Sequence, residues 1–427
     1  MHRNFSLKYP AVIIALLMSV AVFVNNLAAQ TRISSPYSIY GLGEIYFNNN
    51  FGTLGMGGVS LGLQSNTSVN YINPASYVAV DSNSFVFESI VFSHFYGQNT
   101  PEQKQFTNYT SLGNLSFAFP VYKWWASAFG LMPYSATGYK VVDQIEYDNI
   151  GMVNYTYEGQ GGIHQIFWGN GFKIGKGLSL GINTSYLFGN YKDISTVSSD
   201  SANFYVSNQH RAVTVNGVMF NIGAQYKTSL PSNRELIIGV AGGNNTALHS
   251  DEALVQRIYL PGFTVPDTVL NYVNEQGKIV IPAYYALGFT LKINKNWMAG
   301  ADFYNQNWQT FKFFNQALNL NNSYQIGLGT QYIPDSDIGV DFLTRMKYTA
   351  GLRYKQTYIF HNNNSVNEIG IGFGLSFRLR RNLSGMTLGF EWANRGSVEN
   401  NNLREDLYRF NIGVNIHERW FIRSKFY

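Results

Sequence analysis

The sequence predicts an all-β protein: a closed antiparallel transmembrane β-barrel of roughly fourteen strands, with an N-terminal plug, or hatch, in its lumen. Three observations carry this prediction. The chain begins with a secretory signal, its composition is unlike that of water-soluble proteins, and apolar residues alternate along many segments of about ten residues.

Residues 1–29 have the order of a cleavable signal peptide. Arg3 and Lys8 precede an apolar run at residues 11–24, and two alanines follow it. The run is shorter than the roughly 20 residues of a spanning helix, and no other segment competes with it. We therefore expect export across the inner membrane of a Gram-negative bacterium, without a helical anchor.

The composition points to a surface that water alone does not solvate. Charged residues make up 13% of the chain, against about 25% in globular domains, and aromatic residues make up 16%. The absence of cysteine fits a chain that passes unfolded through an oxidising periplasm. Without Arg3 and Lys8 the net charge falls from +5 to +3, and no stripe of cations forms a nucleic-acid surface.

Alternation with a period of two residues is clearest at residues 369–379. One face carries Ile, Phe and Leu, and the other carries Gly, Ser and Arg. The pattern returns at residues 178–188, 324–332, 386–392 and 408–416. Tyr and Trp close several apolar faces, as in the aromatic girdles of membrane barrels.

The expected strands are joined by connections that alternate in length. The strands begin near residues 84, 112, 124, 161, 178, 211, 235, 281, 297, 322, 347, 367, 385 and 404. Long connections, placed outside the cell, are expected at 98–111, 141–159, 193–210 and 250–280. Because the chain enters and leaves the barrel on the periplasmic side, the number of strands must be even. We therefore expect the barrel at 84–418, with 407–416 as its closing strand. After a turn at His417 and Glu418, residues 419–427 would form a periplasmic tail.

Residues 30–83 precede the first strand and are rich in turn-forming residues, with seven glycines between positions 41 and 62. Such a segment ahead of a barrel is most simply a plug. Within it, the runs at 55–59 and 68–75 carry Gly55, Gly57 and Gly58, then Asn73, Pro74 and Ala75.

These two runs resemble the long-chain fatty acid transporter (FadL, TodX) family of outer-membrane barrels. The resemblance implies that the Asn-Pro-Ala element belongs to a hatch inside a fourteen-stranded barrel, and that the hatch moves to admit hydrophobic substrates. It also implies a kinked third strand that opens the wall sideways, for which Gly130 and Pro133 are the matching residues. An equal alternative is that Pro133 merely ends its strand. The family's ligand-contacting N-terminal residues have no match in residues 30–38.

Catalytic and metal chemistry find little support in the sequence. Ser60 lies in a Gly-x-Ser-x-Gly pattern at 58–62, but the strand-turn-helix context of a nucleophile elbow is missing and a chance match is expected among 41 glycines. The histidines show no metal-ligand spacing. We therefore expect no enzyme activity, no metal and no cofactor.

Four charged residues fall on predicted inward faces: Arg353, Arg378, Glu391 and Arg409. They could hold the polar head of a ligand or anchor the plug, but lumen charges more often simply face water and pair with one another.

Two functions are therefore weighed for the plugged barrel. The first is a porin-like channel for uptake of hydrophobic or amphipathic small molecules, such as fatty acids, across the outer membrane. The alternative is a non-transporting barrel subunit of an outer-membrane protein secretion or barrel-assembly machine. The expected partners are the lipid bilayer, an apolar ligand and other outer-membrane proteins, and not nucleic acid.

Overall fold

The computed structural model describes residues 35–46, 53, 55–201, 204–260, 267–335, 343–378 and 383–419. The signal peptide expected at 1–29 lies outside these ranges, as do residues 420–427 of the expected tail. Among the residues described, no helix combines the length and the apolar character needed to cross a bilayer.

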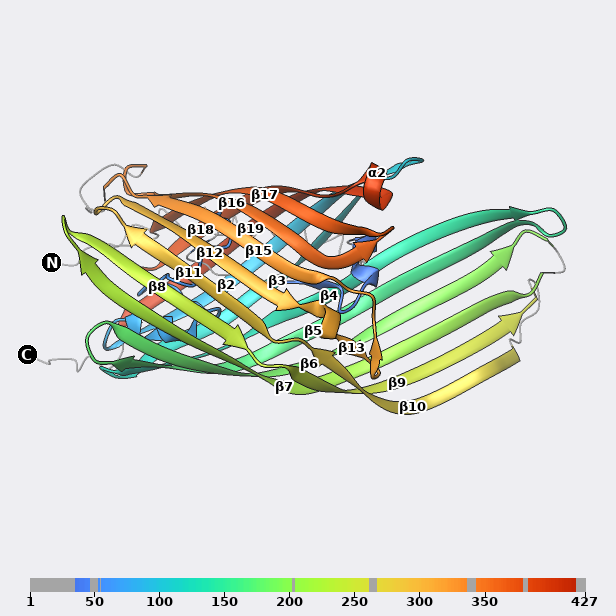
Figure 1. The fold of residues 1–427 in the computed structure, drawn as a ribbon, viewed down its shortest axis with the longest axis horizontal. Coiled ribbons are helices and arrows are strands. Elements are labelled where there is room, and N and C mark those ends of the chain that lie inside the picture. The colour runs from blue at the N-terminus through green and yellow to red at the C-terminus, as the bar shows by residue number, and fades with distance from the viewer. Residues whose placement is uncertain are drawn as a thin grey trace, which may run out of the picture.

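A ring of fourteen antiparallel strands forms the wall of a closed barrel in the described part of the chain (Figure 1). In wall order the strands are β2 (Ser84–Asn99), β3 (Lys104–Tyr122), β4 (Trp125–Tyr147), β5 (Gly151–Ile174), β6 (Leu178–Ser199), β7 (Val206–Leu230), β8 (Arg234–Gly243), β11 (Tyr284–Lys292), β12 (Trp297–Asn307), β15 (Asn322–Tyr332), β16 (Lys347–His361), β17 (Asn364–Arg378), β18 (Gly385–Ser397) and β19 (Leu403–Arg419). Strand β19 closes the ring on β2, with Arg404 opposite Asn99 and Arg419 opposite Ser84. The expected fold class is confirmed.

The two faces of the wall differ as the alternation predicts. In β17, Ile369 and Phe373 are 59% and 55% exposed on the outer, lipid-facing side. At the end with short turns, Tyr122 stacks on Trp124 and Trp297 packs on Tyr332, as in an aromatic girdle. The short-turn end therefore faces the periplasm, and the opposite end faces outward.

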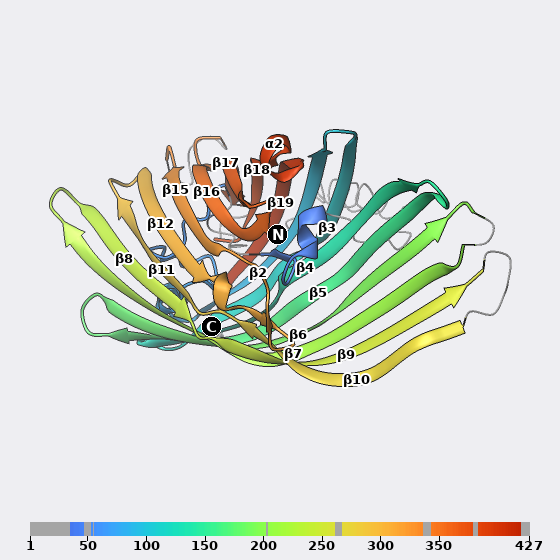
Figure 2. The same cartoon turned by 45° about the vertical axis from the view of Figure 1, so that its right-hand side comes forward.

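Beyond the barrel, an open curved sheet extends on the outer side, and Figures 1 and 2 show it leaving the wall. This outer sheet consists of the outer halves of β4, β5, β6 and β7 with the hairpin of β9 (Thr246–Tyr259) and β10 (Asp267–Ile281). Strand β7 pairs with β8 in its inner half and with β9 in its outer half.

The long outer loops expected from the sequence are therefore mostly strands. Strand β3 begins at Lys104 instead of 112, β5 at Gly151 instead of 161, and β7 at Val206 instead of 211. The tip of the outer sheet is exposed on both faces, as at residues 142–152. A strand wetted on both sides needs no alternation of apolar and polar residues, so the period-two signal disappears there.

The outer sheet has two edges that lack a paired neighbour over most of their length in the described residues. Strand β3 pairs with β4 only as far as Leu115 opposite Leu131. On the other side, β10 pairs with β13 (Lys312–Phe313) only at Ile279 and Val280. We call the separation of β3 from β4 beyond Leu131 the seam.

The end of the barrel also differs from the expectation. His417 and Glu418 pair with Val86 and Phe85 inside β19, so the predicted turn is wrong and the closing strand continues to Arg419. The remaining short elements lie at the outer rim: η4 (Trp308–Thr310), β14 (Gln316–Ala317) and α2 (Val398–Asn401).

The hatch fills the lumen with three short elements: η1 (Pro36–Ile39), β1 (Glu44–Ile45) and η3 (Pro74–Ala79). Its side chains include several of the most buried in the protein, among them Leu42, Met56, Leu61 and Tyr77. The part of the lumen that these hatch residues occupy is thus a packed core.

Candidate functional site

The Asn-Pro-Ala element of the hatch begins η3 and joins it to the wall. The Asn73 side chain accepts a hydrogen bond from the Ala75 N–H at 3.2 Å and so caps the helix, while Pro74 takes the first position, where no donor is needed. The Asn73 amide donates to the carbonyl of Leu61 at 2.9 Å and to that of Ala224 in β7 at 3.2 Å. It also reaches the carbonyl of Val240 in β8 at 3.4 Å, so one side chain links two hatch segments and two wall strands.

Polar wall side chains hold the hatch backbone. Asp302 of β12 accepts the N–H groups of Ser60 at 2.6 Å and Leu61 at 2.9 Å. Other contacts of this kind include Glu88 with Val69, Asn183 with Tyr71, Gln225 with Leu61, Thr290 with Gly62, and Asn415 with Thr67. Ser60 is itself fully buried and bonds to Tyr304 at 2.8 Å, so its place in the structure is that of a hatch contact.

Glycines on the wall allow the hatch backbone to lie directly on the strands. A Cβ atom at Gly351 would collide with the backbone of Met56 and Gly57, and one at Gly239 would collide with the backbone of Leu61. Gly57 has a φ of +62°, which favours glycine at this turn. The small residues predicted for the inner face are therefore the surface on which the hatch packs.

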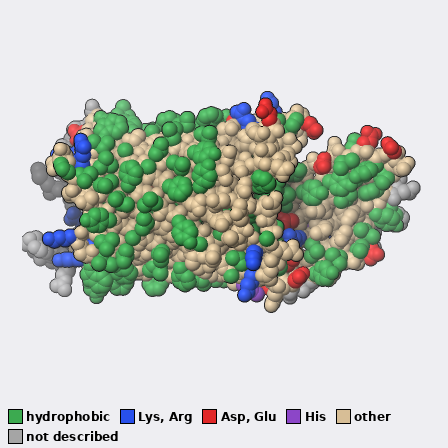
Figure 3. All heavy atoms as spheres, viewed as in Figure 1, with side chains coloured by type: hydrophobic (Ala, Val, Ile, Leu, Met, Phe, Trp, Pro, Cys, Tyr) green, Lys and Arg blue, Asp and Glu red, His purple; other side chains and the backbone are tan. Residues whose placement is uncertain are grey.

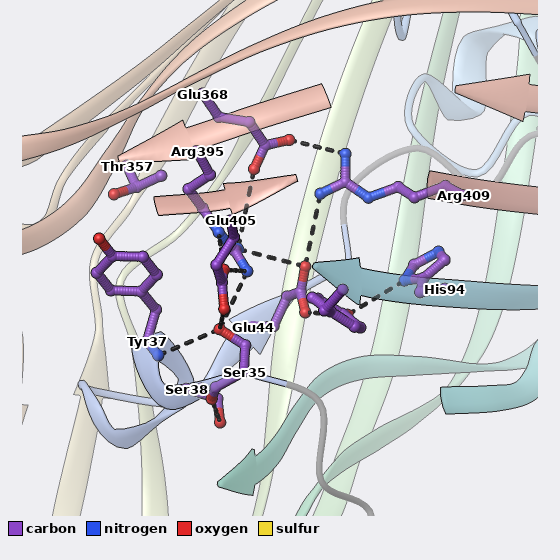
Figure 4. Close-up of polar contacts among 12 residues, drawn as sticks. Ser35, Tyr37, Ser38, Glu44, His94, Thr357, Glu368, Arg395, Glu405 and Arg409 are labelled. Atoms are coloured by element: carbon purple, nitrogen blue, oxygen red, sulfur yellow. Dashed lines mark hydrogen bonds and ion pairs between the residues drawn. The ribbon is translucent and has the colours of Figure 1, made fainter. Parts of the chain in front are cut away.

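A cluster of buried charges joins the start of the hatch to four adjacent wall strands. Figure 4 shows its members Glu44, Glu368, Arg395, Glu405 and Arg409. This lumen ion cluster consists of Glu44, Arg353, Glu368, Glu391, Arg395, Glu405 and Arg409. Arg409 lies 2.7 Å from Glu368, and Arg395 lies 2.5 Å from Glu405. Four carboxylates face three guanidinium groups, and each Arg reaches more than one partner.

Glu44 is the hatch's own member of this cluster. Its carboxylate lies 3.5 Å from Arg395 and 3.6 Å from Arg409, and it accepts the hydroxyl of Tyr96 at 2.7 Å. Burial alone would raise the pKa of Glu44, but Arg395 and Arg409 together hold that pKa below its usual value. Ser35 adds a second hatch contact by donating to Glu405 at 2.7 Å.

Three of the four lumen charges predicted from the sequence belong to the cluster: Arg353, Glu391 and Arg409. Arg378 lies apart, at the periplasmic mouth. Glu368, Arg395 and Glu405 were not predicted as lumen charges. Each lies an even number of residues from an inward-facing residue of its own strand, namely Gly370, Glu391 and Arg409, and this spacing could have identified them. Glu44 carries no such signal, because it lies in the hatch, where no strand periodicity exists.

The hatch strand β1 lies on the edge of β4 that the seam exposes. Glu44 and Ile45 lie opposite Ala136 and Ser135, and the Tyr46 N–H donates to the Tyr134 carbonyl at 3.0 Å. Farther out, Gly138 donates to the Ser38 hydroxyl at 3.0 Å. The hatch therefore covers the inner part of the seam.

Gly130 and Pro133 lie where β4 leaves β3. Their strand continues to Tyr147, so Pro133 does not end it, and the β4–β5 register shifts between Pro133 and Ser135. A proline fits there because it has no N–H to donate, and the register shift marks a local bend.

On the outer side of the lumen, an apolar cluster joins the start of the hatch to the wall and the outer rim. Tyr37 and Leu42 of the hatch pack there with Trp308, Phe311 and Tyr358. Trp308 stacks on Tyr358 with 4.4 Å between ring centroids, and the Tyr358 hydroxyl donates to the Tyr40 carbonyl at 3.1 Å.

Three cavities beside the hatch are small. One of about 40 Å³ lies at the seam, one of about 100 Å³ touches the lumen ion cluster, and one of about 30 Å³ lies near Tyr304. Sites for small-molecule ligands usually measure about 300–1,000 Å³.

The closed ring and the apolar outer face define an outer-membrane β-barrel, and the described hatch residues pack inside it. The BamG family model matches residues 11–427, and the chain belongs to the BamG family. No curated protein matches the sequence.

Solved structures show the same fold at low identity. They include the toluene transporter TodX of Pseudomonas putida, with 15% identity and a TM-score of 0.60 over 88% of this chain and all of that one. The toluene transporter TbuX of Ralstonia pickettii has 12% identity and a TM-score of 0.56 over 92% of this chain and all of that one. A FadL homologue of Pseudomonas aeruginosa has 12% identity and a TM-score of 0.54 over 88% of this chain and all of that one. The resemblance to FadL and TodX is thereby confirmed as a likeness of fold.

Proposed function

We propose that this chain is a non-conducting barrel that serves as an interaction subunit of an outer-membrane machine for protein secretion or barrel assembly. The observation that carries the proposal is the fixed hatch. Its backbone is bonded to wall side chains along residues 60–71, and its start is held in the lumen ion cluster. To open a path, several buried polar groups would have to lose their partners at once, at about 1–3 kcal/mol each.

The outer sheet supplies a surface for partners. The outer edges of β4 and β10 expose long rows of backbone donors and acceptors, and such edges bind added strands from other chains. Val142 and Ile145 on β4 and Tyr272 on β10 are large apolar residues that are 40–54% exposed. A long, exposed and partly apolar edge promotes aggregation unless something covers it. A partner protein at the outer sheet would provide that cover.

The test is purification of the tagged full-length chain from its own outer membrane in a mild detergent. We expect other outer-membrane proteins to co-purify in fixed stoichiometry. The double variant Val142→Lys/Ile145→Lys, which places two charges on the β4 edge, should release them. Tyr205→Lys changes an equally exposed residue at the outer tip, away from both edges, and should keep them. If the wild-type chain purifies alone as a monomer, the proposal is contradicted.

Uptake of hydrophobic or amphipathic small molecules, such as fatty acids, is the second candidate function. It is favoured by the cavity at the seam, where Tyr46, Tyr71, Met132 and Pro133 form a largely apolar lining, and by the fold shared with the transporters above. Proteoliposomes carrying the purified chain, supplied with radiolabelled oleate, distinguish the two functions. If more oleate enters these proteoliposomes than enters empty liposomes, uptake is favoured. If the two amounts are equal, the subunit function is favoured.

A further inference from the structure

A large open cavity lies at the periplasmic end of the lumen, below the hatch. We call it the vestibule. Its volume is about 1,040 Å³, at least tenfold that of each cavity beside the hatch. Hatch residues 63–67, 78, 79 and 81 line it, together with residues of β7, β11, β12 and β15–β19 and residues in and beside the turn between β5 and β6. The lining comes from around the ring, so the vestibule opens along the barrel axis and not toward the bilayer.

The charges that line the vestibule are almost all positive. Among the described residues its cations are Lys173, Lys176, Lys227, Lys292, Arg345, Lys347 and Arg378, and its only carboxylate is Asp81. Figure 3 shows Lys and Arg side chains at this end of the molecule and several Asp and Glu side chains on the outer sheet. Such a concentration of like charge in a concave, partly enclosed site focuses the potential and attracts anions.

Neighbouring acids balance only part of this charge. Glu235 bridges Lys227 at 2.7 Å and Lys292 at 2.8 Å, and Asp81 lies 3.5 Å from His417. In addition, the Arg345 Nε atom is buried with no hydrogen-bond partner among the described residues. A buried donor without a partner is costly, and a carboxylate could satisfy it once the Arg345 side chain turns toward the vestibule.

We infer that the vestibule binds an acidic, carboxylate-rich peptide segment of a periplasmic partner protein. The shape and position of the site favour a peptide over a membrane lipid, because a lipid headgroup would have to leave the bilayer and pass around the periplasmic turns. The cations come from β5, β7, β11, β16 and β17, more strands than one carboxylate can contact, which fits a chain with several acidic side chains. Arg345 and Arg378 can each take a carboxylate with two parallel hydrogen bonds, and the lysines act as mobile point charges.

The test uses the full-length chain in phosphatidylcholine nanodiscs and a fluorescein-labelled peptide of ten glutamates, read by fluorescence anisotropy. We expect saturable binding that weakens as salt is raised. The variant Lys173→Gln/Lys176→Gln/Arg378→Gln should weaken it at least tenfold. The matched control is Lys123→Gln/Arg234→Gln/Lys295→Gln, three cations in or directly after other periplasmic turns that do not line the vestibule. It should change the affinity less than twofold.

The inference would be overturned by absence of saturable binding, by equal loss in both triple variants, or by tighter binding of inorganic tripolyphosphate with the same dependence on the variants. The last would make the vestibule a site for small phosphates. Abolition of peptide binding by phosphatidylglycerol in the nanodisc would assign the cations to lipid and would also overturn it. Heat-modifiable gel mobility verifies that each variant is folded. The inference builds on the proposed function, but the outer-sheet variants test that function separately, so either can fail alone.

Discussion

Glu44 of the hatch lies opposite Ala136 of β4, on the strand edge that β3 leaves unpaired. The same residue extends its carboxylate to within 3.5 Å of Arg395 in β18. One hatch residue thus contacts the wall on both sides of the seam, through its backbone on one side and its charge on the other. The pairing and the ion cluster lead to separate predictions.

A disulfide between Ile45→Cys and Ser135→Cys should form spontaneously in the periplasm. The two residues are directly opposite each other, next to the hydrogen-bonded pair of Tyr46 and Tyr134, and opposed side chains in such a position are close enough for a disulfide. The chain has no other cysteine, so no competing bridge can form. Non-reducing gel mobility of the purified protein measures the cross-link.

The control for that cross-link is Ile45→Cys with Val141→Cys. Val141 lies on the same strand, six residues from Ser135 and beyond the reach of Ile45. If the Ser135 pair remains reduced while the Val141 pair cross-links, β1 does not lie on the β4 edge as described.

Arg395→Gln should destabilise the barrel strongly. Arg395 is 5% exposed and touches Glu44, Glu368 and Glu405. Its loss leaves the buried Glu405 without a counter-charge, while Glu44 and Glu368 keep Arg409. Breaking a buried pair in this way costs about 3–5 kcal/mol. Urea unfolding in detergent micelles, followed by tryptophan fluorescence, measures the change. Arg404→Gln removes an ion pair whose Arg is 49% exposed, and should cost at most about 1 kcal/mol.

Acidification should loosen the hatch through Glu44. The pKa of Glu44 is lower in the folded protein than its unfolded value of about 4.5. The ionised carboxylate therefore stabilises the fold fully above about pH 4.5, and this stability is lost as the pH falls through the lower pKa of the folded state. The Glu44→Gln variant should therefore be less stable than wild type at pH 7, and the difference should shrink below about pH 4.5. Urea midpoints across this range measure it, with the exposed Glu102→Gln as control. A difference that grows on acidification would contradict the assigned sign.

The wall could be predicted from the sequence because the bilayer imposes a simple rule on each strand. Ile369, Ile371 and Phe373 must face lipid, and the glycines between them must face the lumen. The alternation of residues alone therefore predicts both that the segment is a strand and which side chains point outward. The rule ends where the bilayer ends. Strand β5 starts ten residues before its predicted beginning at 161, because water solvates both faces of the outer sheet.

The interior could be predicted only in part. Arg353, Glu391 and Arg409 share the inward parity of their strands, but parity does not reveal which charges meet. Arg378 has the same inward prediction and lies at the other end of the lumen. The polar contacts of Asp302 and Gln225 with the hatch backbone depend on tertiary approach, which no local pattern records.

The last prediction concerns Gly351, on which the Met56–Gly57 backbone lies. A Cβ atom at this position would collide with backbone atoms that cannot rotate away, so Gly351→Ala should displace the hatch and cost about 1–3 kcal/mol. We expect stepwise ion conductance in planar bilayers, where the wild-type chain should show none. Gly97→Ala is the matched control, because its Cβ atom would meet nothing closer than 3.6 Å. Adding the Ile45→Cys/Ser135→Cys bridge should reduce the conductance of Gly351→Ala by holding β1 on β4. If Gly351→Ala folds with wild-type stability and remains closed, contact between hatch and glycine is not what seals the lumen.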